Sequence, residues 1–176
     1  MKIGVFGSST ISNDDIALKA KEIGKIIASK NYQVLTGGVP GYPDVVAKAA
    51  LEAGGRAIAY AAGKKLQDHN KFYEVDLSPY SQVIFQDNYF SNDFSRADLY
   101  VRSLDLVCNV DKAIVIGGRV GTMYELTMLS GLGKDIFVLE GSGGVTETTI
   151  KRFIEEGHKE KSKIIYFSSP KELLNL

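Results

Sequence analysis

The residues of this chain that could do chemistry gather in three glycine-rich turns. Glycine lets backbone N–H groups approach a phosphate closely, and a helix that follows supplies free amides and the positive end of its dipole. The three turns together therefore predict a nucleotide or phosphate site, although glycine also suits any tight turn between a strand and a helix. The candidate binding residues are Gly7, Ser8, Ser9, Gly37, Gly38, Gly117, Gly118, Arg119, Gly121 and Thr122.

Two charged residues near the third turn have chemistry of their own. Arg102 could hold a phosphate or a ribose by bidentate hydrogen bonds, or it could be a solvated or salt-bridged residue on the surface of a helix. Glu125 could act as a catalytic carboxylate. The spacing from Thr122 to Glu125 is also that of a capping box, in which the glutamate accepts a hydrogen bond from the backbone of the turn. Both interpretations of each residue stay open at this point.

The standard phosphate-binding motifs are absent from the sequence. No Gly-x-x-x-x-Gly-Lys-Ser/Thr segment occurs, which disfavours a P-loop NTPase. Residues 4–9 do not fit Gly-x-Gly-x-x-Gly, and no acidic residue ends the second predicted strand to hold a ribose. A dinucleotide-dependent oxidoreductase is therefore disfavoured as well.

Metal and thiol chemistry have little support in the sequence. His69 and His158 lie in polar segments without a cluster of acidic or histidine partners, so we expect no metal site. Cys108 is the only cysteine, which excludes a disulfide framework and suits a reducing compartment. Its apolar neighbours Leu106 and Val107 predict a small buried side chain rather than a nucleophile.

The glycine turns alternate with apolar runs and helical patterns. This β-α-β order predicts one Rossmann-like domain over residues 1–176, a doubly wound α/β fold with a mostly parallel sheet and helices on both faces. Since the carboxyl ends of parallel strands meet at one edge, the turns should share one rim, where ligands bind at the point of reversed strand order. The expected strands are 3–6, 33–36, 57–61, 82–86, 113–116, 136–139 and 163–167. The expected helices are one that opens at Ser12, and 45–53, 94–109, 122–130, 146–156 and 170–175.

The stretch 63–93 is the least regular part of the chain. It is longer than an ordinary connection between elements, so a lid or a substrate loop is plausible there. It holds several aromatic residues, which could pack on the sheet edge or stack on a base. These residues are Phe72, Tyr73, Tyr80, Phe85, Tyr89 and Phe90.

Charge and hydropathy limit the partners that we expect. The 21 lysines and arginines balance 21 acidic residues, so the formal net charge is zero. This balance argues against a general nucleic-acid binder and against a polybasic protein of the membrane surface, and we expect neither partner. The apolar start, residues 3–6, is too short for the core of a signal peptide, and no run approaches the ~18 apolar residues of a membrane span. We therefore expect a cytoplasmic protein.

The segment 102–125 is the most specific part of the sequence, and it resembles the LOG family of nucleotide-binding proteins. The family pattern is an arginine on a helix, an aspartate, and then Pro-Gly-Gly-x-Gly-Thr-x-x-Glu. The turn at residues 7–9 and the segments 35–41 and 53–55 also look like parts of that family, so the resemblance spans nearly the whole chain. Within the segment 102–125, the positions that match the family pattern are Arg102, Asp111, Gly118, Gly121, Thr122 and Glu125.

The resemblance implies an activity, because the characterised members are cytokinin-activating nucleoside 5′-monophosphate phosphoribohydrolases. It implies that the chain cleaves a nucleoside 5′-monophosphate to a free base and ribose 5-phosphate, as a homodimer and without a metal or an organic cofactor. In this picture Glu125 faces the anomeric carbon and Arg102 positions the phosphate. The backbone amides of Gly118, Gly121 and Thr122 hold that phosphate.

Departures from the family pattern favour a second hypothesis. Gly117 stands in place of the proline, Arg119 replaces the second glycine, and residues 42–44 read Tyr-Pro-Asp. These changes favour a non-catalytic sensor or carrier of a nucleotide or related phosphorylated ligand, built on the same fold. A pyridoxal phosphate-dependent decarboxylase is disfavoured, because no lysine after the glycine turns is placed to form the Schiff base.

Overall fold

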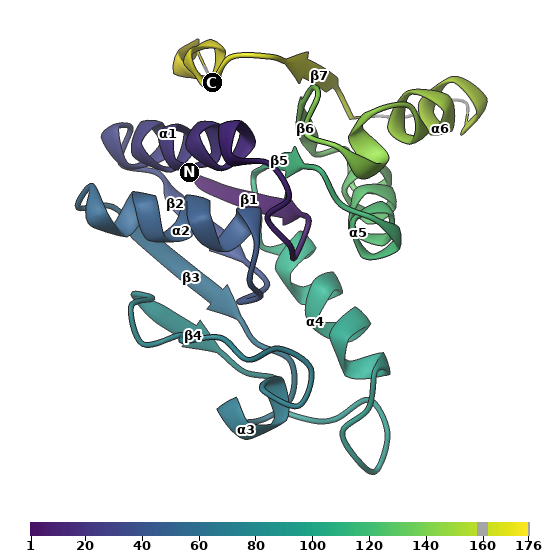
Figure 1. Cartoon of the computed structure of the whole chain (residues 1–176). Helices are drawn as coiled ribbons and strands as arrows, with labels where there is room; N and C mark the ends of the chain where they lie inside the picture. The colour runs from purple at the N-terminus through teal and green to yellow at the C-terminus, as the bar shows by residue number, and fades with distance from the viewer. Residues whose placement is uncertain (158–161, 176) are drawn as a thin grey trace.

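A seven-stranded parallel sheet forms the centre of the structure, a computed structural model that describes residues 1–157 and 162–175 (Figure 1). The strands are β1 (Lys2–Gly7), β2 (Gln33–Thr36), β3 (Arg56–Tyr60), β4 (Gln82–Ile84), β5 (Lys112–Ile116), β6 (Asp135–Leu139) and β7 (Ile164–Phe167). The α-helices are α1 (Asp14–Ser29), α2 (Tyr42–Glu52), α3 (Leu66–His69), α4 (Ala97–Cys108), α5 (Val120–Gly131) and α6 (Thr149–Gly157). Two 3₁₀ helices, η1 (Gly144–Thr146) and η2 (Pro170–Asn175), complete the described elements.

The strand order is β4-β3-β2-β1-β5-β6-β7, and all neighbouring strands run parallel. The chain moves outward from β1 to β4, and α4 then carries it back so that β5 pairs with the other side of β1. Gly7 at the end of β1 is in register with Ile116 at the end of β5. The predicted doubly wound α/β fold is therefore confirmed, and its strand order reverses between β1 and β5.

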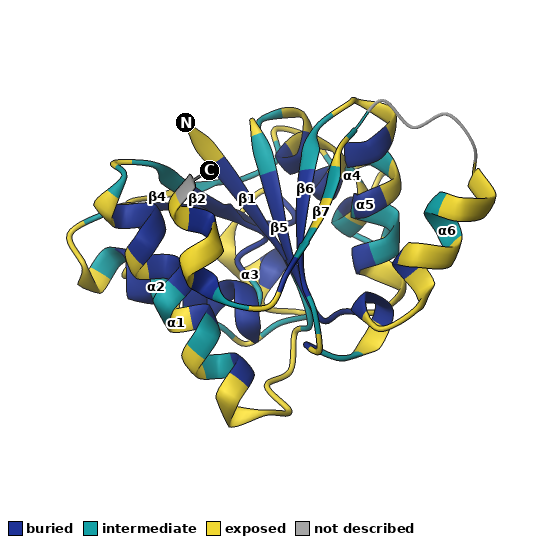
Figure 2. Ribbon diagram, turned by 90° about the horizontal axis from the view of Figure 1, so that it is seen from above, coloured by how far each residue is buried: buried dark blue, intermediate teal, exposed yellow. Residues whose placement is uncertain are grey.

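Two hydrophobic clusters cover the two faces of the sheet. Side chains alternate between the faces along each strand, so Val5 of β1 belongs to the cluster under α1 and α2, and Phe6 to the cluster under α4 and α5. Figure 2 shows the buried strands between these two helical layers. Burial on both faces explains why the strands read as short continuous apolar runs. No helix of the described residues is long and apolar enough to cross a membrane.

Several element boundaries differ from the sequence prediction for local reasons. The first helix begins at Asp14 rather than at Ser12, because the Asn13 side chain accepts hydrogen bonds from the N–H groups of Asp15 and Ile16. The predicted helix 146–156 is divided into η1 and α6, and the closing helix is a 3₁₀ helix. The prediction for Cys108 is wrong: its side chain is exposed, because it lies at the end of α4 on the side away from the sheet.

Buried acidic side chains organise the irregular segment before α4. Asp98 is fully buried and accepts hydrogen bonds from the N–H groups of Phe90 and Ser95, both at 2.8 Å. Asp68 accepts one from the hydroxyl of Tyr89 at 2.7 Å. The aromatic residues take different places: Tyr80 packs in the core, whereas 71% of Phe90 is exposed. Packing therefore explains part of this aromatic cluster, and the segment forms a structured wall beside β3.

Candidate functional site

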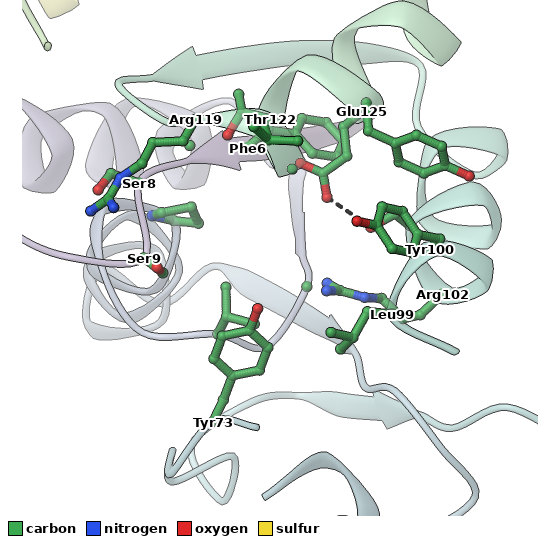
Figure 3. A pocket seen from close by; sticks show the side chains of 18 of the residues that line it. Phe6, Ser8, Ser9, Tyr73, Leu99, Tyr100, Arg102, Arg119, Thr122 and Glu125 are labelled. Carbon is green, nitrogen blue, oxygen red and sulfur yellow. Dashed lines mark hydrogen bonds between the residues drawn. The ribbon is translucent and has the colours of Figure 1, made fainter. Parts of the chain in front are cut away.

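A cavity of about 680 Å³ lies at the carboxyl ends of β1, β2 and β5, where the strand order reverses (Figure 3). Its lining comes from the turns after β1 and β2, from α4 and from the first turns of α5, with Tyr73 from the irregular segment. The structure brings nine predicted residues together in this lining. They are Gly7, Ser8, Ser9, Gly37, Arg102, Arg119, Gly121, Thr122 and Glu125.

The turn after β1 is tightly built. Gly7 has a φ of +153°, and a Cβ there would overlap the carbonyl oxygen of Ile116. Only glycine lets the ends of β1 and β5 stay this close, with the Ser8 N–H donating to the Ile116 carbonyl at 3.0 Å. The Ser8 hydroxyl closes its own turn, because it donates to the Thr10 carbonyl at 2.7 Å. Ser9 is exposed and lines the cavity.

Arg102 is a buried cation on the wall of the cavity. It extends from α4 with an exposed fraction of only 6%, and its Nε has no hydrogen-bond partner among the residues that the structure describes. Its guanidinium lies against Gly37, where a Cβ would overlap Nη1 and lie 2.7 Å from Cζ. Burial lowers the pKa of Arg102, and the negative charge of Glu125 opposes that shift. A buried cation without such a partner is costly unless an anion binds beside it.

Glu125 faces the same cavity from α5 and is partly buried (Figure 3). Its Oε1 accepts a hydrogen bond from the Ser103 hydroxyl at 2.9 Å. Burial raises the pKa of Glu125, while Arg102 and the Ser103 hydrogen bond pull it down. The capping-box interpretation is wrong, because α5 begins one turn earlier: its N-cap is Arg119, which makes no side-chain capping bond.

The first turn of α5 presents polar groups to the cavity. Arg119 is exposed, whereas Thr122 has an exposed fraction of 4%. The N–H groups of the first turn of α5 point toward the cavity, as does the positive end of the helix dipole. No side chain of the N-cap residue accepts a hydrogen bond from these N–H groups. This end of the cavity can therefore bind an anion through amides and the Arg119 side chain.

Three of the predicted glycines lie behind the lining rather than in it. The Gly117 N–H donates to the Ser142 hydroxyl at 2.8 Å, and the Gly118 carbonyl accepts from the Val145 N–H at 3.0 Å. Gly38 turns away toward the buried His69. These glycines support the shape of the turns, so the amide of Gly118 is not among the groups that face the cavity.

The sequence reasoning missed several residues of the lining. Ser103 is adjacent to Arg102 on α4 and donates a hydrogen bond to Glu125, while Tyr73 reaches the cavity from the irregular segment and Arg96 from the N-cap of α4. Tyr100 makes an edge-to-face contact with Tyr124, with 4.9 Å between ring centroids. Ser103 has a signal in its position beside a predicted site residue, and Tyr73 is one of the aromatic residues of the segment 63–93 that could stack on a base. The others reach the cavity through tertiary packing.

The electrostatics of the cavity differ from those of the whole chain. Among the residues that the structure describes, the arginines in the lining are Arg96, Arg102 and Arg119, and the carboxylate there is that of Glu125. The described residues contain no group of three or more His, Cys, Asp and Glu side chains placed to hold a metal ion. His158, at which the sequence also predicts no metal site, lies outside the described residues. The cavity is therefore locally cationic in a chain of zero net charge.

Comparisons with known proteins agree with this fold. A family model described as the SLOG cluster4 family matches residues 1–174. An uncharacterized protein of Archaeoglobus fulgidus is 28% identical over 140 residues, which cover 80% of each chain. The structure of TM1055 has a TM-score of 0.77 at 22% identity and covers 99% of this chain and 96% of that one. The molybdenum cofactor carrier protein from Chlamydomonas reinhardtii has a TM-score of 0.71 at 19% identity, over 99% and 93%.

One expectation is contradicted by another structure of this fold. DNA processing protein A from Helicobacter pylori, for which a single-stranded DNA binding mode is described, has a TM-score of 0.70 at 14% identity, over 99% of this chain and 79% of that one. The exclusion of nucleic acid as a partner is therefore wrong. That exclusion was based on the net charge of the whole chain, whereas binding to a phosphate backbone depends on where lysine and arginine side chains cluster on the surface. The expected homodimer and the LOG family itself stay predictions.

Proposed function

We propose a function for this chain, which belongs to the SLOG cluster4 family. The cavity of the chain binds a nucleoside 5′-monophosphate and hydrolyses its N-glycosidic bond, which yields the free base and ribose 5-phosphate. The observation that carries this proposal is the pairing of Arg102 and Glu125 in one cavity. A buried arginine without a partner for its Nε and a partly buried carboxylate face the same space, and no salt bridge joins them among the described residues.

The two anion-binding ends of the cavity have separate roles in this proposal. Arg102 offers a planar set of N–H donors that suits a phosphate or the hydroxyls of a ribose. At the other end, Arg119 and the first-turn amides of α5 bind anionic oxygen atoms. The ligand then spans the cavity between α4 and α5, with its anomeric carbon near Glu125.

Glu125 supplies the chemistry of the reaction. Cleavage breaks the bond between C1′ and the base nitrogen, and the electron pair leaves with the base. The carboxylate stabilises the positive charge that develops on the sugar and removes a proton from the water that attacks C1′. The proton passes to the departing base, so that the carboxylate is regenerated. Burial raises the pKa of Glu125 toward the range in which a general base works near neutral pH.

A carrier of a phosphorylated ligand is the second candidate. Solved structures of the same fold include the molybdenum cofactor carrier protein from Chlamydomonas reinhardtii. One oxygen of Glu125 also accepts a hydrogen bond from Ser103, as a purely structural carboxylate would. A carrier would use the same cationic cavity to bind its ligand and would release it unchanged.

Purified protein incubated with AMP, GMP, CMP and UMP distinguishes the two candidates. Free base and ribose 5-phosphate are quantified, and binding is measured by calorimetry. We expect turnover of at least one monophosphate that falls by a factor of about 10² or more in Glu125→Gln while binding remains. Glu52→Gln, at an exposed glutamate at the end of α2, is the matched control and should leave turnover unchanged. Saturable binding of a monophosphate without turnover would contradict hydrolysis and favour the carrier.

A further inference from the structure

The turn between β2 and α2 is held from both sides by buried side chains. The Gly38 N–H donates to the Thr36 hydroxyl at 3.1 Å, and the Gly38 carbonyl lies 2.6 Å from Nε2 of His69. Thr36 and His69 are both fully buried. Both polar groups of the Gly38 backbone are thus fixed, and the position of this turn depends on α3, which carries His69.

Hydrogen bonds define the protonation state of His69. The Ala62 N–H donates to Nδ1 at 3.1 Å, so Nδ1 carries no proton. The proton of the neutral ring is therefore on Nε2, which donates it to the Gly38 carbonyl. Burial lowers the pKa of His69, the hydrogen bond to Gly38 opposes that shift, and the charge of Arg102 adds to it, so that the pKa stays below its ordinary value. The ring is consequently neutral at physiological pH, with both nitrogens engaged.

The same turn forms the surface on which Arg102 rests. The Cα of Gly37 lies so close to the guanidinium that a Cβ would overlap Nη1 and lie 3.2 Å from Nη2. Arg102 has no partner for its Nε among the described residues, and its guanidinium is in contact with Gly37. A shift of the turn would therefore remove a contact that limits where the guanidinium can lie.

We propose that His69 is a positioning residue, which fixes the Gly37–Gly38 turn and thereby orients the Arg102 guanidinium toward an anion in the cavity. This inference rests on the proposed function in one respect, that the cavity binds a monophosphate. It connects the irregular segment with the anion site. The position of Arg102 then depends on α3, so a substitution of His69 alters the affinity for the monophosphate although His69 does not contact that ligand.

Three variants test the proposal. The amide nitrogen of glutamine can take the place of Nε2, so His69→Gln keeps the donor to Gly38, whereas His69→Leu removes it. Ile23→Val removes one methylene from the fully buried core beneath α1, away from the cavity, and controls for lost stability alone. Two quantities are measured: the affinity for AMP by calorimetry, and the shift and solvent exchange of the Arg102 Nε–H in protein with ¹⁵N-labelled arginine.

We expect His69→Leu to weaken AMP binding about 10-fold, the lower end of the range for one hydrogen bond to a charged group, and to displace the Arg102 signal. His69→Gln should stay within about twofold of wild type with the signal in place, and Ile23→Val should change neither quantity. Thr36→Val removes the other anchor of Gly38 and should reproduce the loss if His69→Leu does not fold.

Two results would overturn the inference. One is an unchanged Arg102 signal in His69→Leu, and the other is a loss of AMP affinity that follows the loss of stability across all variants, Ile23→Val included. A wild-type protein that binds no monophosphate would contradict the proposed function. In that case the Arg102 signal alone decides whether His69 positions the arginine.

Discussion

Gly37→Ala is the substitution with the sharpest expected effect on the candidate site. Gly37 does not have a positive φ, so its backbone conformation is open to alanine. The added Cβ would nevertheless overlap Nη1 of Arg102 and lie 2.7 Å from Cζ. A contact this short requires the guanidinium to move, because the backbone of the turn is fixed through Gly38. One methyl group thus displaces the buried cation without removing it.

The size of the effect follows from the contacts that Arg102 can make. Hydrogen bonds from arginine to an anion have lengths of about 2.7–2.9 Å, and displacement by about an ångström breaks them. Such a hydrogen bond to a charged group contributes about 1.5–3 kcal/mol. Its loss weakens monophosphate binding by about 10- to 150-fold. The free energy of unfolding should change less than this, since the displaced guanidinium can move into the cavity.

Calorimetry with AMP measures this loss, in a Glu125→Gln background so that the ligand is not consumed. Gly131→Ala is the matched control, because a Cβ at this position in the last turn of α5 would meet no atom within 4 Å. Its affinity should equal that of the parent. In an Arg102→Met background, Gly37→Ala should cause no further loss. The reasoning is refuted if Gly37→Ala binds AMP within twofold of the parent, or if it weakens binding equally after Arg102 is removed.

Two further predictions concern pH. Ser103→Ala removes the hydrogen bond that lowers the pKa of Glu125, so the acidic limb of the pH–rate profile should move to higher pH; an unchanged limb would contradict a role for Glu125 as the base. The pKa of His69 is lowered from its ordinary value of 6.5, so its contribution to folding is fully present above that value and is lost as the pH falls below it. Urea unfolding between pH 7.5 and 5 should therefore show a decrease in unfolding free energy that is smaller in His69→Gln, and equal decreases would contradict the assignment.

The location of the cavity could be predicted from the glycines, for a geometric reason. In a parallel sheet every strand ends at the same edge, so turns that are far apart in sequence must meet there. Gly7, Gly37 and Gly121 do line one cavity, together with Arg102 and Glu125. The spacing of apolar residues between these turns also predicts which segments are strands and which are helices.

The individual roles of residues could not be predicted in the same way. Gly117 looks like Gly121 in the sequence, yet its N–H donates to Ser142, a residue from the turn after a different strand. His69 lies in a polar segment of the sequence, and nothing in its neighbourhood there indicates that the residues after β3 and after β2 enclose it. These roles depend on contacts between distant parts of the chain, which a local pattern does not contain.

The strand order explains how a neutral chain can present a cationic cavity. Because β5 pairs with β1 rather than with β4, α4 has to cross from one edge of the sheet to its centre, and its middle lies beside the point of reversal. Arg102 and Ser103 are in the middle of that helix. After β1 the chain continues to α1 on one face of the sheet, and after β5 it continues to α5 on the other, so the cavity beside Glu125 lies where the two paths diverge. Burying the charge of Arg102 has a cost that no described hydrogen bond to its Nε offsets, so an anion that binds beside it recovers part of that cost as affinity.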